Sequence, residues 1–180
     1  MKKSTQNKLE KAHQTFSNWK ELPWKKKQVL LKKLANILDK NAEKFGKIIT
    51  KEMNKPISQS IAEVQKCALM VNYYAEMKPQ LQLEKVKTDF AISEIHYVPK
   101  GVILGVMPWN FPFWQVLRFA VPAILAGNTI VLKHASICIE SGDKIQEIFG
   151  KAGFPIGVFT HLEIGHDEVA ELLEHDFVQG

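Results

Sequence analysis

Residues 101–107 read Gly-Val-Ile-Leu-Gly-Val-Met, and residues 108–112 continue as Pro-Trp-Asn-Phe-Pro. A continuous apolar run followed by proline-rich sequence is typical of a strand that is buried on both faces of a parallel sheet. Further along, helical and strand-like patterns alternate at 113–126 (helix), 129–132 (strand), 145–152 (helix), 157–160 (strand) and 167–174 (helix). This order predicts an α/β fold with a Rossmann-like parallel sheet and right-handed crossovers.

The residues before this sheet are predicted to form helices. Leu30, Leu34, Ile37 and Leu38 share one helix face, and a second apolar stripe runs through residues 57–75. From Thr88 to Val98 apolar and polar residues alternate, which predicts an extended, partly exposed strand in a hairpin. Such a strand is either an ordinary sheet edge or an oligomerisation element, and the sequence leaves both interpretations open.

Composition limits the setting and the partners. The chain has 180 residues, of which 46% are hydrophobic, and no apolar run approaches the roughly 20 residues that span a bilayer. No secretory signal opens the chain, and Cys67 and Cys138 are too few for a disulfide framework, so a cytoplasmic protein is expected. Of the 24 basic residues only Arg118 is an arginine, which argues against a nucleic-acid partner despite the net charge of +5. His161, His166 and His175 lack the spacing of a metal site.

Two segments are expected at the binding edge of the sheet, because ligands of open parallel sheets bind at the carboxyl ends of the strands. The first strand runs into Pro108–Pro112, and the second runs into Lys133-His134-Ala135-Ser136. Prolines on both sides of Asn110 would hold its amide as a fixed donor, as an oxyanion site requires. An asparagine that caps a turn is the alternative.

Several motifs, in order along the chain, resemble the aldehyde dehydrogenase family. They are Pro108-Trp109-Asn110-Phe111-Pro112, the runs 126–133 and 152–159, and upstream Glu52-Met53-x-Lys55-Pro56, Glu63-Val64 and Tyr73-Tyr74-Ala75-Glu76. The segments Lys133-His134-Ala135 and 112–116 are most similar to the succinate-semialdehyde dehydrogenase branch. The resemblance implies that residues 1–180 are the N-terminal part of the NAD(P)-binding domain, with the catalytic domain absent.

In that family an NAD(P)-dependent enzyme oxidises an aldehyde to its acid through a cysteine thiohemiacetal and thioester. The resemblance implies that Asn110 stabilises the oxyanion and that Trp109 and Asn110 lie against the nicotinamide. It also implies that Lys133, His134, Ala135 and Ser136 contact the adenosine ribose, although Lys133 as an ordinary surface lysine is the alternative. NAD-preferring members commonly carry Glu where this chain has Ser136, so we expect tolerance of, or preference for, NADP.

The family's catalytic Cys and Glu lie beyond the matched part, and two interpretations follow. The chain is part of a homo-oligomeric aldehyde dehydrogenase, as a fragment, split gene product or trimmed piece. Alternatively, it is a truncated, non-catalytic remnant that binds nucleotide weakly or associates with intact subunits. In both cases we expect the chain alone to be inactive. We also expect marginal stability, because residues 129–132 or 157–160 would present an unpaired apolar sheet edge.

Overall fold

The computed structural model describes residues 1–79 and 83–180. The helices are α1 (Lys3–Glu21), α2 (Trp24–Lys40), α3 (Ala42–Met53), α4 (Ile57–Glu76), α5 (Trp114–Leu125), α6 (Ile139–Ala152) and α7 (His166–Leu173). The strands are β1 (Glu84–Lys85), β2 (Glu94–Ile95), β3 (Val102–Met107), β4 (Thr129–His134) and β5 (Phe159–His161). No helix in these ranges is both long and apolar enough to cross a membrane.

The central sheet is parallel and has the order β3–β4–β5. Its register pairs Val102 with Thr129 and Met107 with His134, so the predicted alternation of strands and helices is confirmed. After α7 the chain returns to the free side of β3, where Val178 forms a parallel bridge with Val102. The N–H of Leu104 donates to the carbonyl of Gly180 over 2.7 Å, which ties the last residues to β3.

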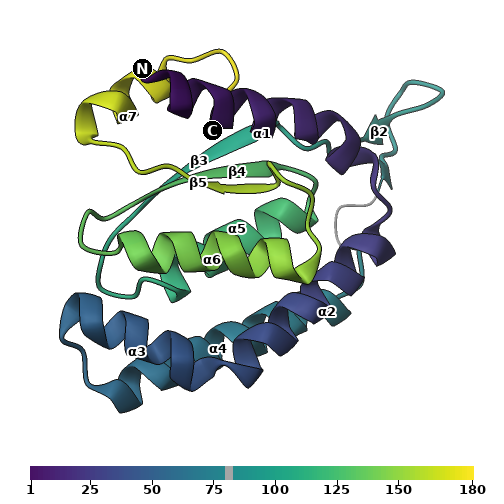
Figure 1. Ribbon diagram of the computed structural model, residues 1–180. Helices are drawn as coiled ribbons and strands as arrows, with labels where there is room; N and C mark the ends of the chain where they lie inside the picture. Colours follow the sequence, from purple (N-terminus) through teal and green to yellow (C-terminus); the bar gives the residue numbers. More distant parts are fainter. Residues whose placement is uncertain (80–82) are drawn as a thin grey trace.

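The elements form four layers (Figure 1). Helices α1 and α7 cover one face of the sheet, α5 and α6 cover the other face, and α2, α3 and α4 pack beneath α5 and α6. The larger core lies between the sheet and the helices from α2 to α6, and a smaller core lies beneath α1 and α7. Because α5 and α6 lie on one face and α7 lies on the other, the direction of winding reverses beside β3.

The N-terminal helices follow from their apolar stripes. On α2 the buried positions are Leu31, Leu34, Ala35 and Leu38, whereas Leu30 and Ile37, which the spacing also assigned to this face, are only partly buried. On α4 the predicted stripe is buried from Val64 to Ala75, and Cys67 is a core thiol, as its place beside the stripe indicated. Helix α6 ends at Gly153, whose φ of 93° is the left-handed conformation that favours glycine at a helix end.

The expectation of an unpaired edge at residues 129–132 is wrong, because β4 is the middle strand and pairs on both sides. The outer strand is β5, and side chains cover part of its free edge. The N–H of His161 donates to Oε1 of Gln146 over 2.6 Å, and Nζ of Lys8 donates to the carbonyl of His161 over 2.9 Å. These two side chains occupy backbone groups that would otherwise pair with another strand.

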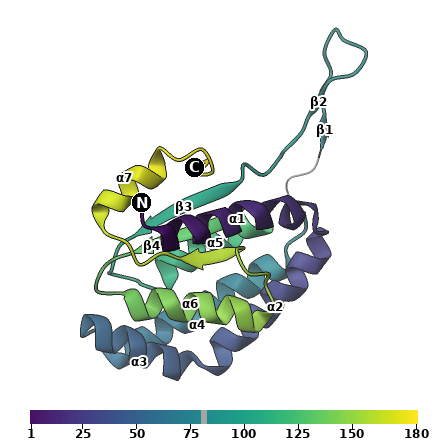
Figure 2. The same ribbon diagram turned by 45° about the horizontal axis from the view of Figure 1, so that its top comes forward.

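The expected strand at 88–98 is wrong in its extent. Only Glu94–Ile95 is a strand, paired antiparallel with Glu84–Lys85 in a hairpin that projects from the body of the molecule (Figure 2). Away from the body these residues have no second layer to pack on, and Phe90, Ile92 and Val98 are 81%, 80% and 78% exposed. The hairpin itself, and the exposure expected of it, are confirmed.

Candidate functional site

The two segments that the sequence assigned to the binding edge lie side by side. Met107 and His134 are register partners at the carboxyl ends of β3 and β4, so the loop 108–112 starts beside Ala135 and Ser136. This loop leaves β3 at the point where the winding reverses, between β4 and residues 178–180. In doubly wound sheets such a point forms the crevice in which ligands bind.

His134, the last residue of β4, is in hydrogen-bond contact with the loop 108–112. Its Nε2 lies 3.0 Å from the carbonyl of Pro112, and its Nδ1 accepts the N–H of Ala135 over 2.8 Å. Because Nδ1 accepts this hydrogen bond, the neutral ring carries its proton on Nε2 and donates it to Pro112. Burial lowers the pKa of His134 to about 4, so the ring is neutral at pH 7. Both ring nitrogens are thus engaged by the backbone, in contact with the loop rather than turned toward a ligand.

Glu63 of α4 anchors the far end of the same loop. Its Oε1 accepts the N–H of Phe113 over 2.9 Å and the N–H of Trp114 over 3.1 Å, at the first turn of α5. Its Oε2 pairs with Nζ of Lys55 over 2.5 Å, and this ammonium also lies 3.9 Å from the ring centroid of Phe111. A carboxylate at a helix N-terminus is favoured by the helix dipole as well as by the hydrogen bonds.

Asn110 itself is exposed at the centre of these contacts. Its side chain has no hydrogen-bond partner among the residues that the structure describes. The alternative interpretation, that Asn110 caps a turn, would require its amide to bond locally, and α5 begins without a side-chain cap. Trp109 beside it is 56% exposed, while its carbonyl lies 3.8 Å from Sγ of Cys138. The site therefore presents a free amide donor on a held backbone.

Lys133 at the end of β4 is one of two buried lysines in the described part of the chain, the other being Lys27 of α2. Lys133 is 4% exposed, yet within the described part of the chain its ammonium has no ion pair. A nearly buried cation without a counter-charge is suited to a ligand that brings oxygen acceptors. Ala135 is half-buried and Ser136 is exposed on the loop that follows. Ala135 and Ser136 thus provide accessible surface next to the buried Lys133.

A second carboxylate, that of Glu52 on α3, accepts hydrogen bonds at the N-terminus of α6. It accepts the N–H of Ser141 over 3.2 Å and the Ser141 hydroxyl, and burial raises its pKa. Helix N-termini are common anion sites. Since Glu63 and Glu52 occupy those of α5 and α6, neither helix start is free for a phosphate. This agrees with the absence of a G-x-G-x-x-G motif after β3.

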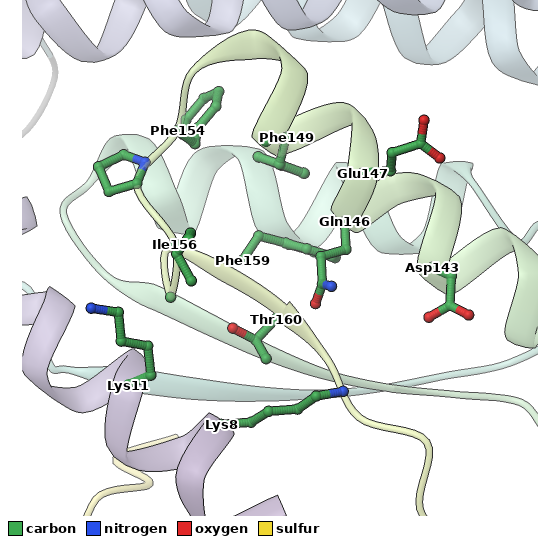
Figure 3. A pocket seen from close by; sticks show the side chains of 13 residues that line it. Lys8, Lys11, Asp143, Gln146, Glu147, Phe149, Phe154, Ile156, Phe159 and Thr160 are labelled. Carbon is green, nitrogen blue, oxygen red and sulfur yellow. The ribbon is translucent and has the colours of Figure 1, made fainter. Parts of the chain in front are cut away.

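Two hollows are considered as possible binding sites. One, of about 530 Å³, runs along α1 and the outer side of β5, where Lys8 and Lys11 face Phe149, Phe154 and Phe159 (Figure 3). It lies two strands away from the Asn110 loop. A smaller one, of about 270 Å³, is lined by Lys55, Glu63, Lys66, Phe111 and Trp114 and adjoins that loop. The smaller hollow is therefore the one of these two that lies next to Asn110, through its neighbour Phe111.

Neither cysteine is an accessible nucleophile. Cys67 and Cys138 are both free thiols with no exposed surface. Burial raises the pKa of Cys138 to about 12 and that of Cys67 still further, so neither forms a thiolate near pH 7. The described residues also contain no cluster of His, Cys, Asp and Glu that could hold a metal ion.

The fold and the site together define a Rossmann-like α/β domain with an exposed amide at its switch point. The aldehyde dehydrogenase family model matches residues 1–180, and the chain belongs to that family. The resemblance drawn from the sequence motifs is thereby confirmed.

Similar proteins place the chain within a part of the family. It is 47% identical over 173 residues to a Synechocystis protein named probable succinate-semialdehyde dehydrogenase (NADP+), covering 96% of this chain and 38% of that protein. It is 39% identical to a succinate semialdehyde dehydrogenase (NAD(P)+) of Escherichia coli, covering 94% of this chain and 37% of that one. A crystal structure of succinic semialdehyde dehydrogenase from Streptococcus pyogenes with NADP+ superposes on this chain with a TM-score of 0.92 at 33% identity. The match covers 99% of this chain and 40% of that one. The chain thus spans about two fifths of the length of these relatives.

Sequence reasoning missed two residues that shape the site. Glu63 and Lys55 were noted as parts of motifs, but their contact with the Asn110 loop was not foreseen. A signal was present: both are charged residues close to the buried stripe of α4, where an unpaired charge would be costly. Arg118, the one arginine, was considered only in the argument about nucleic acid.

Proposed function

We propose that these 180 residues are the N-terminal part of an aldehyde dehydrogenase that uses NADP or NAD and oxidises succinate semialdehyde to succinate. The observation that carries the proposal is the free amide of Asn110 at the switch point, on a backbone held by Glu63 and His134. The names of the Synechocystis, Escherichia coli and Streptococcus pyogenes relatives support the substrate and the cofactor.

The role proposed for Asn110 is electrostatic. When a nucleophile bonds to the carbonyl carbon of the aldehyde, the carbonyl electron pair moves onto oxygen and the oxygen becomes negative. The Asn110 side-chain N–H donates to that oxygen from a backbone that the contacts of Glu63 and His134 hold in place. The nucleophile is proposed to come from outside these residues, since Cys67 and Cys138 are buried thiols.

The cofactor is proposed to bind along the edge formed by Trp109 and residues 133–136. When bound, the nicotinamide supplies the hydride acceptor of the oxidation. The Lys133 ammonium donates to ribose hydroxyls, a role that fits its burial without an ion-pair partner in the described ranges. Ser136 is neutral and exposed, so it offers no negative charge to repel a 2′-phosphate.

Arg118 is the proposed partner of the substrate carboxylate. It is the single arginine of the chain, it is exposed, and no carboxylate of the described residues pairs with it. It lies one turn beyond Trp114 on α5, the helix that the Asn110 loop begins. A guanidinium binds a carboxylate through two parallel hydrogen bonds, which suits a semialdehyde that carries a carboxylate at its far end.

The hairpin around β1 and β2 is proposed to bind another subunit in a homo-oligomer. Phe90, Ile92 and Val98 are apolar and largely exposed on an element that projects from the body. Exposed apolar surface of this kind is typical of an interface. The same observation favours a second candidate, a non-catalytic chain that associates with intact subunits. A cytoplasmic setting, in which thiols stay reduced, suits the two free cysteines.

The proposed function is tested by replacing Asn110 with alanine in the protein that contains this chain together with its nucleophile. We expect kcat for NADP reduction by succinate semialdehyde to fall by about 100- to 1000-fold, because one oxyanion donor is lost. The Kd for NADP should change by less than about threefold. An Asn110→Ala protein with the wild-type kcat would show that the amide has no part in the reaction.

A further inference from the structure

The backbone on both sides of Asn110 is held by other elements of the fold. The contacts are Cys138 Sγ to the Trp109 carbonyl, Lys55 to the Phe111 ring, His134 to the Pro112 carbonyl, and Glu63 to the N–H groups of Phe113 and Trp114. The Asn110 side chain is exposed and has no partner in the described part of the protein. Its neighbours therefore fix the backbone from which the amide projects.

Glu63 makes two of these five contacts and is itself fixed from two sides. One oxygen accepts both N–H groups at the start of α5, and the other oxygen pairs with Lys55. The side chains of Glu63 and Lys55 are 2% and 11% exposed, so water does not compete for either charge. The same Lys55 ammonium lies over the ring of Phe111, the residue next to Asn110.

We propose that Glu63, together with Lys55, is a positioning residue for Asn110 in aldehyde oxidation. The proposal rests on the proposed function, in which Asn110 stabilises the oxyanion. Glu63 joins α4 to the first turn of α5, and Lys55 joins the same carboxylate to Phe111, so the loop is held at residues 111, 113 and 114. A displacement of about 1 Å at a catalytic group costs on the order of 100-fold in rate.

The charge of Glu63 is essential to this arrangement, which makes Glu63→Gln the appropriate variant. A glutamine oxygen can still accept from the two backbone N–H groups, but its NH2 group would then face the Lys55 ammonium, donor against donor. The loop therefore loses the link through Lys55 to Phe111 while the side chain keeps nearly its size.

Glu52 provides a matched control. It is a partly buried carboxylate from the N-terminal helices, and it also accepts a backbone N–H at the first turn of a crossover helix, through Ser141 of α6. In the described residues it has no hydrogen bond to the segment 108–114. Glu52→Gln should therefore disturb folding in a similar way without acting on Asn110.

The first test uses the 180-residue chain and needs no activity. We would measure the 15N order parameter of the Asn110 backbone amide, with that of exposed Asn18 on α1 as the reference. We expect Glu63→Gln to lower the Asn110 value from about 0.85 to below about 0.6, the range of flexible backbone, and Glu52→Gln to leave it unchanged. An unchanged Asn110 value in Glu63→Gln overturns the proposal. If Glu63→Gln does not fold, Lys55→Gln breaks the same pair and is compared in the same way.

The second test is a double-mutant cycle in the aldehyde-oxidising protein that contains this chain. We expect Glu63→Gln to lower kcat by about 10- to 100-fold alone, and by less than about threefold when Asn110 is already alanine, because a positioning residue acts through its target. Glu52→Gln should change kcat by the same factor in both backgrounds.

The outcomes separate the two proposals. If Asn110→Ala lowers kcat but Glu63→Gln multiplies the loss equally in both backgrounds, the positioning role is overturned and the proposed function stands. If Asn110→Ala has no effect on kcat, the proposed function fails and the positioning role in catalysis fails with it. The order parameter then still shows whether Glu63 holds the loop.

Discussion

The neutral, buried His134 makes the stability of the chain sensitive to acid. Its Nδ1 accepts the Ala135 N–H and its Nε2 donates to Pro112, so adding a proton to Nδ1 breaks the first of these hydrogen bonds. The pKa of His134 is lowered from 6.5 to about 4, chiefly by burial. In the unfolded chain the ring takes up its proton near pH 6.5, and in the folded chain it does so only near pH 4.

The sign of the effect follows from these two values. The contribution of His134 to stability is complete above pH 6.5, and it is lost as the pH falls toward 4, because the unfolded state then binds the additional proton. One pH unit in this window corresponds to about 1.4 kcal/mol, so the full loss is about 3 kcal/mol. At pH 5 the loss relative to pH 7.5 is about 2 kcal/mol.

The assay is urea unfolding of the chain and of His134→Gln at pH 7.5, 6 and 5, followed by circular dichroism. Glutamine can donate to Pro112 but does not titrate, so other acid-sensitive groups cancel in the difference between the two proteins. We expect the difference in unfolding free energy between wild type and variant to shift by about 2 kcal/mol from pH 7.5 to pH 5. Parallel pH profiles, within about 0.5 kcal/mol, would refute the assignment of a neutral buried ring.

Three further predictions concern the cofactor, the hairpin and one helix. Ser136→Glu in the complete enzyme should weaken NADP binding at least about tenfold and spare NAD; equal loss for both would contradict the 2′-phosphate argument. Phe90→Ser with Ile92→Ser should lower the oligomeric state in ultracentrifugation while leaving the Tm within about 2 °C, and an unchanged assembly would exclude the hairpin as the interface. Gly142→Ala should lower the unfolding free energy by about 1–3 kcal/mol, because its Cβ would lie 2.5 Å from an imidazole of β5. Gly150→Ala in the same helix meets open space and should be stabilising by about 0.5–1 kcal/mol, as denaturant unfolding of both variants can show.

Local patterns were sufficient to predict the parallel sheet. The apolar runs at 101–107 and 129–132 are strands because both faces of the sheet are covered, and their order along the chain determines which ends lie together. The hairpin was predicted with a strand that is too long, because the apolar residues that alternate at 88–98 remain largely exposed in the described part of the chain. Periodicity reports a tendency to be buried, and it does not say whether a partner surface exists.

Some residues of the candidate site could likewise be predicted from the sequence, and others could not. Asn110 and Lys133 could be identified because the end of each strand can be located from the sequence. Neighbouring parallel strands then bring their carboxyl ends to the same edge of the sheet. The contact between Glu63 and the loop joins residues that are 50 positions apart, and it depends on how α4 packs against α5. Spacing along a chain does not contain that information. The orientation of His134, turned toward Pro112, likewise depends on packing in the finished fold.

Gln146 and Lys8 bond to the outer backbone groups of His161, so these groups of β5 are not free to pair with another strand. A strand added beside residues 178–180, which already pair with β3, would displace neither of these side chains. We therefore expect a separately supplied polypeptide strand to add more readily on that side of the sheet than beside His161.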